Sequence, residues 1–217
     1  MKFKYLLIKL ILLLTFSGVK AQEPGFIGGL ILNFNGIQIE GQNEQFWSSI
    51  TGEIWGGGGV SAGGFVKREF SDKVYGVFEL RFIQKGSIYK FANQYGNKAL
   101  ELLKLHYVEV PVLAGFKVHS KQKPIFIESG LAYSKLIRSE TAFNKLVERT
   151  DTPNAGQFKS IDISAVADVK FPVNRKQNLL IGGRVEYSVF SIHKYYNLHN
   201  LDYGIELNYL MGAGKRR

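Results

Sequence analysis

The last strand-like stretch of the sequence alternates strictly between apolar and polar side chains. Between residues 202 and 211, one face carries Tyr203, Ile205, Leu207, Tyr209 and Met211, and the other carries Asp202, Gly204, Glu206, Asn208 and Leu210. A period of two predicts a β-strand with one apolar and one polar face. A strand that comes last must pair with strands already laid down, and pairing with the first strand would close a sheet. We therefore expect a closed sheet whose apolar face turns to lipid.

Similar alternation recurs along the rest of the chain. The expected strands cover residues 26–39, 57–70, 74–89, 102–118, 124–137, 158–173, 179–190 and 202–211. The second, fourth and sixth connections are short turns, and the first, third, fifth and seventh are long. Long outer loops, short inner turns and strands of about ten residues or more are typical of outer-membrane barrels. The predicted fold is all-β: an eight-stranded antiparallel up-and-down transmembrane β-barrel.

Two strands are expected to be irregular. The stretch 57–70 is rich in glycine, which predicts a bend or a close approach to a neighbouring strand. Pro111 lies inside the expected strand 102–118 and lacks the N–H that a strand ladder uses. We keep that strand and expect an irregularity at the proline.

The polar faces of the strands are rich in charge. They hold Glu79, Arg81, Glu109, Lys117, Glu128, Asp162, Asp168, Lys170, Arg184, Glu186, Asp202 and Glu206. Of these, we predict a charge network in the lumen, formed by Glu79, Arg81, Glu109, Lys117, Glu128, Lys170, Arg184, Glu186 and Glu206. An eight-stranded barrel encloses barely enough room for its own side chains, so paired charges that plug the lumen are favoured over a solute path.

The N-terminal residues resemble a secretory signal. Met1 to Lys4 is basic, an apolar run from Leu10 to Phe16 follows, and small residues precede Gln22. We expect a signal peptide at residues 1–21, cleaved after Ala21, and one barrel domain at residues 22–217. Removing the signal lowers the formal net charge from +10 to +6, too mild and scattered an excess to predict nucleic-acid binding. The chain has no cysteine, which excludes disulfides, thiolate metal sites and a lipid-anchored N-terminal cysteine.

Three segments resemble a known family. They are Phe78–Gly86 (FELRFIQKG), Leu105–Leu113 (LHYVEVPVL) and Gly182–Tyr187 (GGRVEY). The chain is similar along nearly all of residues 22–217 to the outer-membrane β-barrel family of Bacteroidetes that is often labelled PorT-like or "porin family". Pro111 belongs to that family's pattern. The resemblance implies an outer-membrane location and a barrel shape, and it implies no shared reaction.

The last strand also resembles the assembly signal of outer-membrane proteins. That signal has a polar residue, a glycine and two spaced hydrophobic residues, here Asp202, Gly204, Leu207 and Tyr209. The chain departs from the common form because it continues from Gly212 to Arg217 rather than ending on an aromatic residue. The resemblance implies recognition by the barrel-assembly machinery.

Catalytic and metal-binding signals are weak. The four histidines His106, His119, His193 and His199 have no recognised ligand spacing, whereas zinc sites need three or four converging ligands. His106 beside a serine or glutamate would suit an acyl hydrolase, but no feature marks such a triad. The glycines at 56–59 lack the Gly-Lys-Ser/Thr of a phosphate-binding loop. We expect no catalytic residue, no metal site and no cofactor.

Specificity is expected in the long loops. Their candidate contact residues are Phe46, Trp47, Trp55, Tyr195 and Tyr196. We predict a non-enzymatic outer-membrane barrel with a structural or interaction role, whose partners are outer-membrane lipid, the barrel-assembly machinery and other envelope proteins. Four alternatives stay open: a PorT-like part of a secretion or gliding apparatus, a small-solute porin, a lipid-modifying membrane enzyme that uses His106, and a soluble periplasmic carrier with its apolar face inside.

Overall fold

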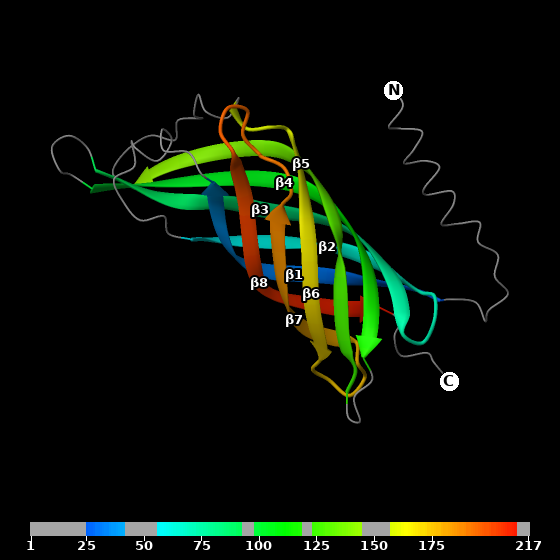
Figure 1. The fold of residues 1–217 in the computed structure, drawn as a ribbon. Helices are drawn as coiled ribbons and strands as arrows, with labels where there is room; N and C mark the ends of the chain where they lie inside the picture. The colour runs from blue at the N-terminus through cyan, green and yellow to red at the C-terminus, as the bar shows by residue number, and fades with distance from the viewer. Residues whose placement is uncertain (1–24, 42–55, 93–97, 119–122, 145–156, 212–217) are drawn as a thin grey trace, which may run out of the picture.

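The protein folds into one closed β-barrel. The computed structural model describes residues 25–41, 56–92, 98–118, 123–144 and 157–211. The strands are β1 (Phe26–Gly41), β2 (Gly57–Glu69), β3 (Val74–Ala92), β4 (Lys98–Val118), β5 (Ile125–Asn144), β6 (Ile161–Pro172), β7 (Leu179–Ser188) and β8 (Leu198–Met211). Consecutive strands pair antiparallel in the order of the sequence (Figure 1). Within these ranges no helix has the length and apolar character needed to cross a membrane.

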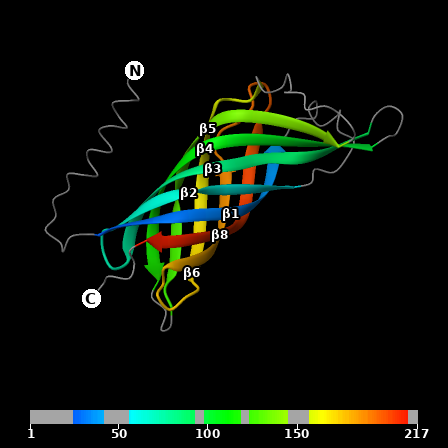
Figure 2. The same ribbon diagram turned by 180° about the vertical axis from the view of Figure 1, so that it is seen from behind.

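The barrel closes through the first and last strands. β1 pairs antiparallel with β8 from Gly28 opposite Met211 to Gly41 opposite Leu198 (Figure 2). The sheet therefore has no free edge along this seam, which is how barrels avoid exposing unpaired backbone groups. The predicted fold class is confirmed.

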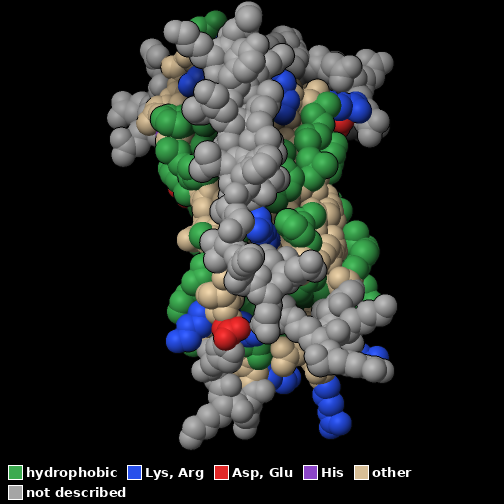
Figure 3. Space-filling model, turned by 90° about the vertical axis from the view of Figure 1, so that its right-hand side faces the viewer, with side chains coloured by type: hydrophobic (Ala, Val, Ile, Leu, Met, Phe, Trp, Pro, Cys, Tyr) green, Lys and Arg blue, Asp and Glu red, His purple; other side chains and the backbone are tan. Residues whose placement is uncertain are grey.

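Side chains alternate between the two faces of the barrel wall. The apolar face predicted for the last strand points outward, with Tyr203, Ile205 and Tyr209 about half exposed, whereas Asp202, Glu206 and Asn208 are buried inside. The same arrangement holds along β6 and β7. Hydrophobic side chains line the flank of the barrel in Figure 3, and Lys and Arg side chains lie mostly toward its two ends. The outward apolar face contradicts the alternative of a soluble periplasmic carrier, because such a carrier needs its apolar face inside the barrel.

The two ends of the barrel differ in their connections. The turn end has the short connections: Ser71 Oγ accepts hydrogen bonds from the N–H groups of Lys73 and Val74, and Asn174 Oδ1 accepts from those of Asn178 and Leu179. Side-chain acceptors of this kind replace lost ladder bonds in tight turns. The opposite, loop end carries the connections between β1 and β2, β3 and β4, β5 and β6, and β7 and β8.

Several predicted strand limits were wrong at the loop end. β3 reaches Ala92 and β4 begins at Lys98, so the third connection, expected to be long, is only residues 93–97. β5 continues to Asn144, inside the expected loop 138–157, β6 begins at Ile161 rather than at residue 158, and β8 begins at Leu198 rather than at residue 202. The extensions of β3, β4, β5 and β8 were not predicted, because their backbone pairing continues where apolar side chains no longer alternate onto the outer face.

The polarity of the wall inverts at the loop end. There the inner face is apolar and forms the loop-end plug: Ile39, Ile83, Leu103, Leu105, Tyr107, Phe158, Ile192 and Leu198. The outer face in the same region carries Gln38, Lys104 and Glu140. A second apolar cluster, the turn-end plug, fills the other end of the interior: Ile31, Phe65, Tyr75, Val77, Leu113, Phe126, Ala132, Val166, Leu180 and Leu210. The charged middle of the lumen therefore lies between two apolar plugs.

The two expected irregularities occur, in modified form. A Cβ on Gly63 would lie 2.2 Å from the carbonyl oxygen of Leu80, so the glycine permits the predicted close approach of β2 to β3. The pairing of β3 with β4 stops at Phe78 opposite Val112 and resumes at Arg81 opposite Glu109, which leaves a gap at Pro111. The register shift in β4, however, lies against β5 between His106 and Tyr107 rather than at the proline.

Candidate functional site

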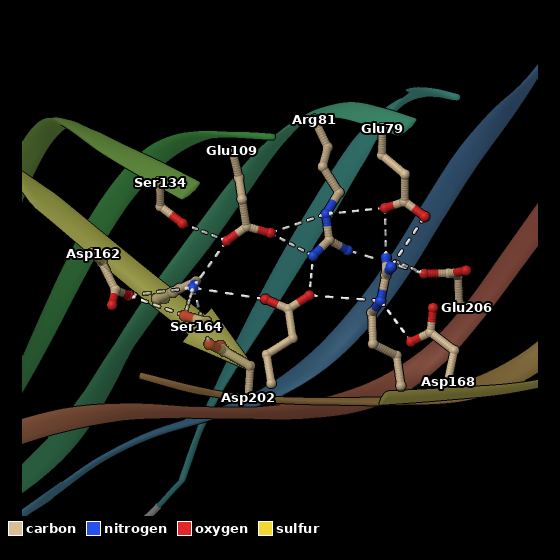
Figure 4. A network of polar contacts seen from close by, with 12 residues as sticks. Glu79, Arg81, Glu109, Ser134, Asp162, Ser164, Asp168, Asp202 and Glu206 are labelled. Atoms are coloured by element: carbon tan, nitrogen blue, oxygen red, sulfur yellow. Dashed lines mark hydrogen bonds and ion pairs between the residues drawn. The ribbon is translucent and has the colours of Figure 1, made fainter. Parts of the chain in front are cut away.

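The polar faces of β3 to β8 converge in one buried network of ion pairs. Alternation along each strand aims every second side chain at the barrel axis, so charges distant in sequence meet inside. Figure 4 shows arginine, carboxylate and hydroxyl side chains of this network facing one another across the lumen. The network has four basic centres, which follow one another from the turn end to the loop end: Lys170, Arg184, Arg81 and Lys85.

Arg184 of β7 holds three carboxylates. Its guanidinium donates two hydrogen bonds to Glu79, with Nη1 2.9 Å from Oε2 and Nη2 3.0 Å from Oε1. Nη1 also donates to Glu206 Oε2 at 2.6 Å, and Nε donates to Asp168 Oδ1 at 2.7 Å. The planar fork of arginine suits such bidentate pairing, and charged hydrogen bonds in a buried site are strong.

Lys170 adds a second cation on the turn-end side of Arg184. Its Nζ lies 2.7 Å from Glu128 Oε2 and 2.8 Å from Glu206 Oε1. The Tyr75 hydroxyl donates to the other oxygen of Glu128 at 3.0 Å. A small cavity of about 10 Å³ lies beside this pair, and Lys67, Glu128, Lys170 and Asn208 are among its lining residues. That volume is about that of a single water site.

Arg81 of β3 links the turn-end and loop-end halves of the lumen. Its Nε donates to Glu109 Oε1 at 3.1 Å, and its Nη2 donates to both Glu109 and Glu186. The Ser134 hydroxyl donates to the other oxygen of Glu109 at 2.6 Å. Arg81 is one of the largest fully buried side chains in the described part of the protein, so the middle of the barrel is filled by its own side chains.

Lys85 gathers carboxylates on the loop-end side of Arg81. Its Nζ lies 2.9 Å from Glu109 Oε2, 3.5 Å from Asp162 Oδ2, 3.6 Å from Glu186 Oε2 and 3.9 Å from Asp202 Oδ2. Three further donors reach Asp162 Oδ2: the hydroxyls of Ser164 and Ser188, and the side-chain amide of Asn200. Lys85 is completely buried, directly beneath the loop-end plug.

The structure brings together eight of the nine residues predicted for the lumen network. These are Glu79, Arg81, Glu109, Glu128, Lys170, Arg184, Glu186 and Glu206. Lys117 lies apart: it is half-buried near the turn end, with its Nζ 6.0 Å from the centre of the Phe126 ring. The predicted network lacked Lys85, Asp162, Asp168 and Asp202, although all four lie on the same alternating faces as its members.

The residues of the predicted assembly signal lie on both faces of β8. Asp202 is buried in the lumen, Gly204 is partly buried, Leu207 is half-buried on the outer face and Tyr209 is exposed on the outer face. The backbone carbonyl of Phe34 would lie 2.3 Å from a Cβ on Gly204, so this glycine allows close contact between β8 and β1. Recognition by an assembly machinery stays a prediction.

Two of the predicted loop contacts lie in the connection between β7 and β8. Tyr195 is 74% exposed, whereas Tyr196 stacks on His193 with ring centres 4.9 Å apart. Phe46, Trp47 and Trp55 lie outside the described residues.

The described histidines lie in separate places. His106 Nε2 lies 3.9 Å from Glu140 Oε1, and the His106 ring lies 6.4 Å from the centre of the Phe82 ring. His193 is buried between Phe158 and Tyr196, and His199 stacks on Tyr187. His119 lies outside the described residues. The carboxylates of Glu79, Glu128 and Asp168 approach within 4.8 Å of one another, and Arg184 and Lys170 already form ion pairs with them.

The sequence matches one protein family. The family described as "Outer membrane protein beta-barrel domain" matches residues 21–206. No curated protein matches the sequence. Similar solved structures include Ail, the attachment invasion locus protein of Yersinia pestis, with 11% identity over 86% of this chain and 99% of that chain and a TM-score of 0.45. Neisserial surface protein A is 11% identical over 85% of this chain and 98% of its own chain, with a TM-score of 0.48. OprG from Pseudomonas aeruginosa is 12% identical over 86% of this chain and 94% of its own chain, with a TM-score of 0.41.

Proposed function

The chain belongs to the outer membrane protein β-barrel domain family, whose members lie in the outer membrane. From this premise we propose that the protein is a plugged barrel. It acts through its loops and conducts no solute. The observation that carries this proposal is the filled lumen. Arg81, Arg184 and their carboxylates span the middle of the interior, and apolar plugs occupy both ends. An open porin needs a water-filled channel, which takes about 16 strands.

Conductance of the purified protein in a planar lipid bilayer tests this proposal. We expect no steady current above that of the bare bilayer, because moving an ion through the lumen would require separating several buried ion pairs. Steady, voltage-stable channels in every insertion would contradict the proposal and favour the small-solute porin. An open porin inserted under the same conditions serves as the positive control.

We place the interaction surface at the loop end. Tyr195 supports this proposal, because it is a large aromatic side chain that projects from the barrel with 74% of its surface exposed. Aromatic residues of this kind often anchor protein contacts. The proposed partners are other envelope proteins, and outer-membrane lipid surrounds the wall.

A photo-crosslinking residue at position 195 tests for such a partner in living cells. The matched control is the same residue at Phe78, which is 50% exposed on the outer face of β3. We expect a protein adduct from position 195 and only lipid adducts from position 78. Lipid adducts alone from both positions would contradict a loop-end partner.

A PorT-like role in a secretion or gliding apparatus is the second proposal, and it rests on the resemblance of Phe78–Gly86 and Leu105–Leu113 to the Bacteroidetes family. Deleting the gene and measuring the secreted proteins tests it: lost secretion supports the role, and an unchanged secretome contradicts it.

We further propose that the protein is not an enzyme and that residues 1–21 are removed as a signal peptide. An unchanged lipid profile after His106→Ala, and a mature protein that begins at Gln22, are the expected results.

A further inference from the structure

The buried charges of the lumen do not balance. Among the described residues, eight carboxylates are buried in the interior: Glu79, Glu109, Glu128, Asp162, Asp168, Glu186, Asp202 and Glu206. Five basic side chains are buried with them: Lys67, Arg81, Lys85, Lys170 and Arg184. Lys67 lies near the turn end and pairs with the partly exposed Glu69. A buried charge without a counter-charge is costly, so the interior needs further positive charge.

The deficit is clearest on the loop-end side of Arg81. There, Glu109, Asp162, Glu186 and Asp202 share Lys85 and part of Arg81, and Glu186 also lies 3.6 Å from Nε of Arg184. Glu109 is well satisfied, with hydrogen bonds from Arg81 and Ser134. Asp162 Oδ2 also receives several hydrogen bonds, whereas Asp162 Oδ1 and both carboxylate oxygens of Asp202 receive none.

Several buried oxygens in this region receive no hydrogen bond. Neither carboxylate oxygen of Asp202 receives a hydrogen bond, and the cation closest to this carboxylate is Lys85 Nζ at 3.9 Å. The same is true of Asp162 Oδ1 and of Asn200 Oδ1, both on side chains that are at most 3% exposed, and the buried Tyr107 hydroxyl interacts with the side chain of Asn200. Asn200 lies two residues before Asp202 on the same face of β8, and its amide nitrogen donates to Asp162 at 3.1 Å.

These atoms share one chemistry. Carboxylate, amide-carbonyl and phenol oxygens are hard ligands of the type that Ca²⁺, Mg²⁺ and Na⁺ prefer. We propose that the loop-end half of the lumen binds one small inorganic cation, held by Asp202 and Asp162 with Asn200 Oδ1 and the Tyr107 hydroxyl as neutral ligands. The cation supplies the positive charge that Lys85 and Arg81 leave missing, and it links β4, β6 and β8 across the barrel. This site was not predicted from the sequence, because its ligands are neither histidine nor cysteine.

The position of the site sets how the cation enters. The loop-end plug covers it on one side and the Arg81 layer on the other. The cation therefore binds during folding or when the barrel opens briefly, and exchange afterwards is slow. This inference does not depend on the proposed loop function, because it concerns the interior alone.

The test uses the natural protein, extracted from membranes in detergent and refolded with CaCl₂, MgCl₂ or NaCl, or with choline chloride at equal ionic strength. We expect the temperature at which the folded gel band disappears to rise by about 5 °C or more when the bound cation is in hundredfold excess over its Kd. Terbium, which replaces Ca²⁺, should luminesce on tyrosine excitation because Tyr107 lies at the site.

Two variants and a control make the result specific. Asp202→Asn should weaken cation binding by more than about tenfold and remove the temperature shift. The exposed turn residue Asp72 provides the matched control, and Asp72→Asn should behave as the natural protein does. If Asp202→Asn does not fold, Tyr107→Phe removes one ligand and the terbium antenna with little change in shape.

Two outcomes would overturn the inference. One is a natural protein whose stability is the same in every salt, which would mean that protons neutralise the carboxylates. The other is an equal cation-dependent shift in the natural protein and in Asp202→Asn, which would place the effect elsewhere.

Discussion

At the scale of single residues, stability depends on a few multivalent cations. Arg184 makes four hydrogen bonds to three carboxylates from β3, β6 and β8. Each of these side chains gave up its hydration to enter the lumen, so the guanidinium offsets three desolvation costs at once. Removing it leaves three buried charges facing one another.

Arg184→Met is therefore expected to lower the free energy of unfolding by about 3–5 kcal/mol, the usual cost of breaking a buried ion pair by removing one partner. Urea unfolding in lipid vesicles measures this change. The matched control is Arg175→Met, which truncates an exposed arginine at the turn end and should change stability by less than about 0.5 kcal/mol. A small effect of Arg184→Met would mean that the carboxylates take up protons freely, against the tight pairing described above.

Single residues also show the limits of prediction from sequence. Alternation assigned Arg81, Glu109 and Arg184 to the interior, but it could not give their depth along the barrel axis. Lys117 and Lys85 both alternate inward, yet only Lys85 reaches carboxylates, because β3 places it level with Asp162 and Glu109. Lys117 lies near the turn end, where the interior is lined by aromatic side chains such as Phe126.

At the scale of elements, the connection between β7 and β8 depends on one neutral histidine. His193 Nδ1 accepts hydrogen bonds from the N–H groups of Tyr195 and Tyr196, at 3.2 and 3.1 Å. The backbone of the same connection bonds to Gln157 and Lys159. Burial lowers the pKa of His193 below its ordinary value, and the nearby charges of Lys159 and Lys194 lower it further.

Acidification should loosen this connection. Because the folded pKa of His193 lies below the unfolded value of about 6.5, the histidine contributes stability that is fully present above that pH and is lost as the pH falls through the folded pKa. Protection of the Tyr195 and Tyr196 amides from hydrogen exchange, corrected for intrinsic rates, should therefore decrease as the pH is lowered from about 8 to about 5. The Val74 amide, which bonds to the Ser71 hydroxyl, is the internal control. Equal changes at all three amides would contradict a histidine-specific effect.

At the scale of the whole molecule, the barrel is a closed hydrogen-bonded ring filled by salt bridges and apolar plugs. A closed wall has no edge from which detergent can begin to unpair strands. After cell fractionation, the protein should appear in the outer-membrane fraction. It should run on a detergent gel at one mobility when kept cold and at another after boiling. A soluble periplasmic protein with a single mobility would contradict the membrane barrel.

The sequence by itself determined the wall of this protein. A period of two predicts strands with one apolar and one polar face, and the charges on the polar face together with the spacing of the connections favour an antiparallel eight-stranded barrel whose apolar face meets lipid. Tertiary structure alone decided where each strand ends and which charges meet. Strand limits at the loop end depend on backbone pairing that continues beyond the lipid, where the side-chain pattern inverts. Ion partners such as Arg184 and Glu79 depend on strand register and tilt, which bring residues of distant strands to one depth, and no local pattern records that depth.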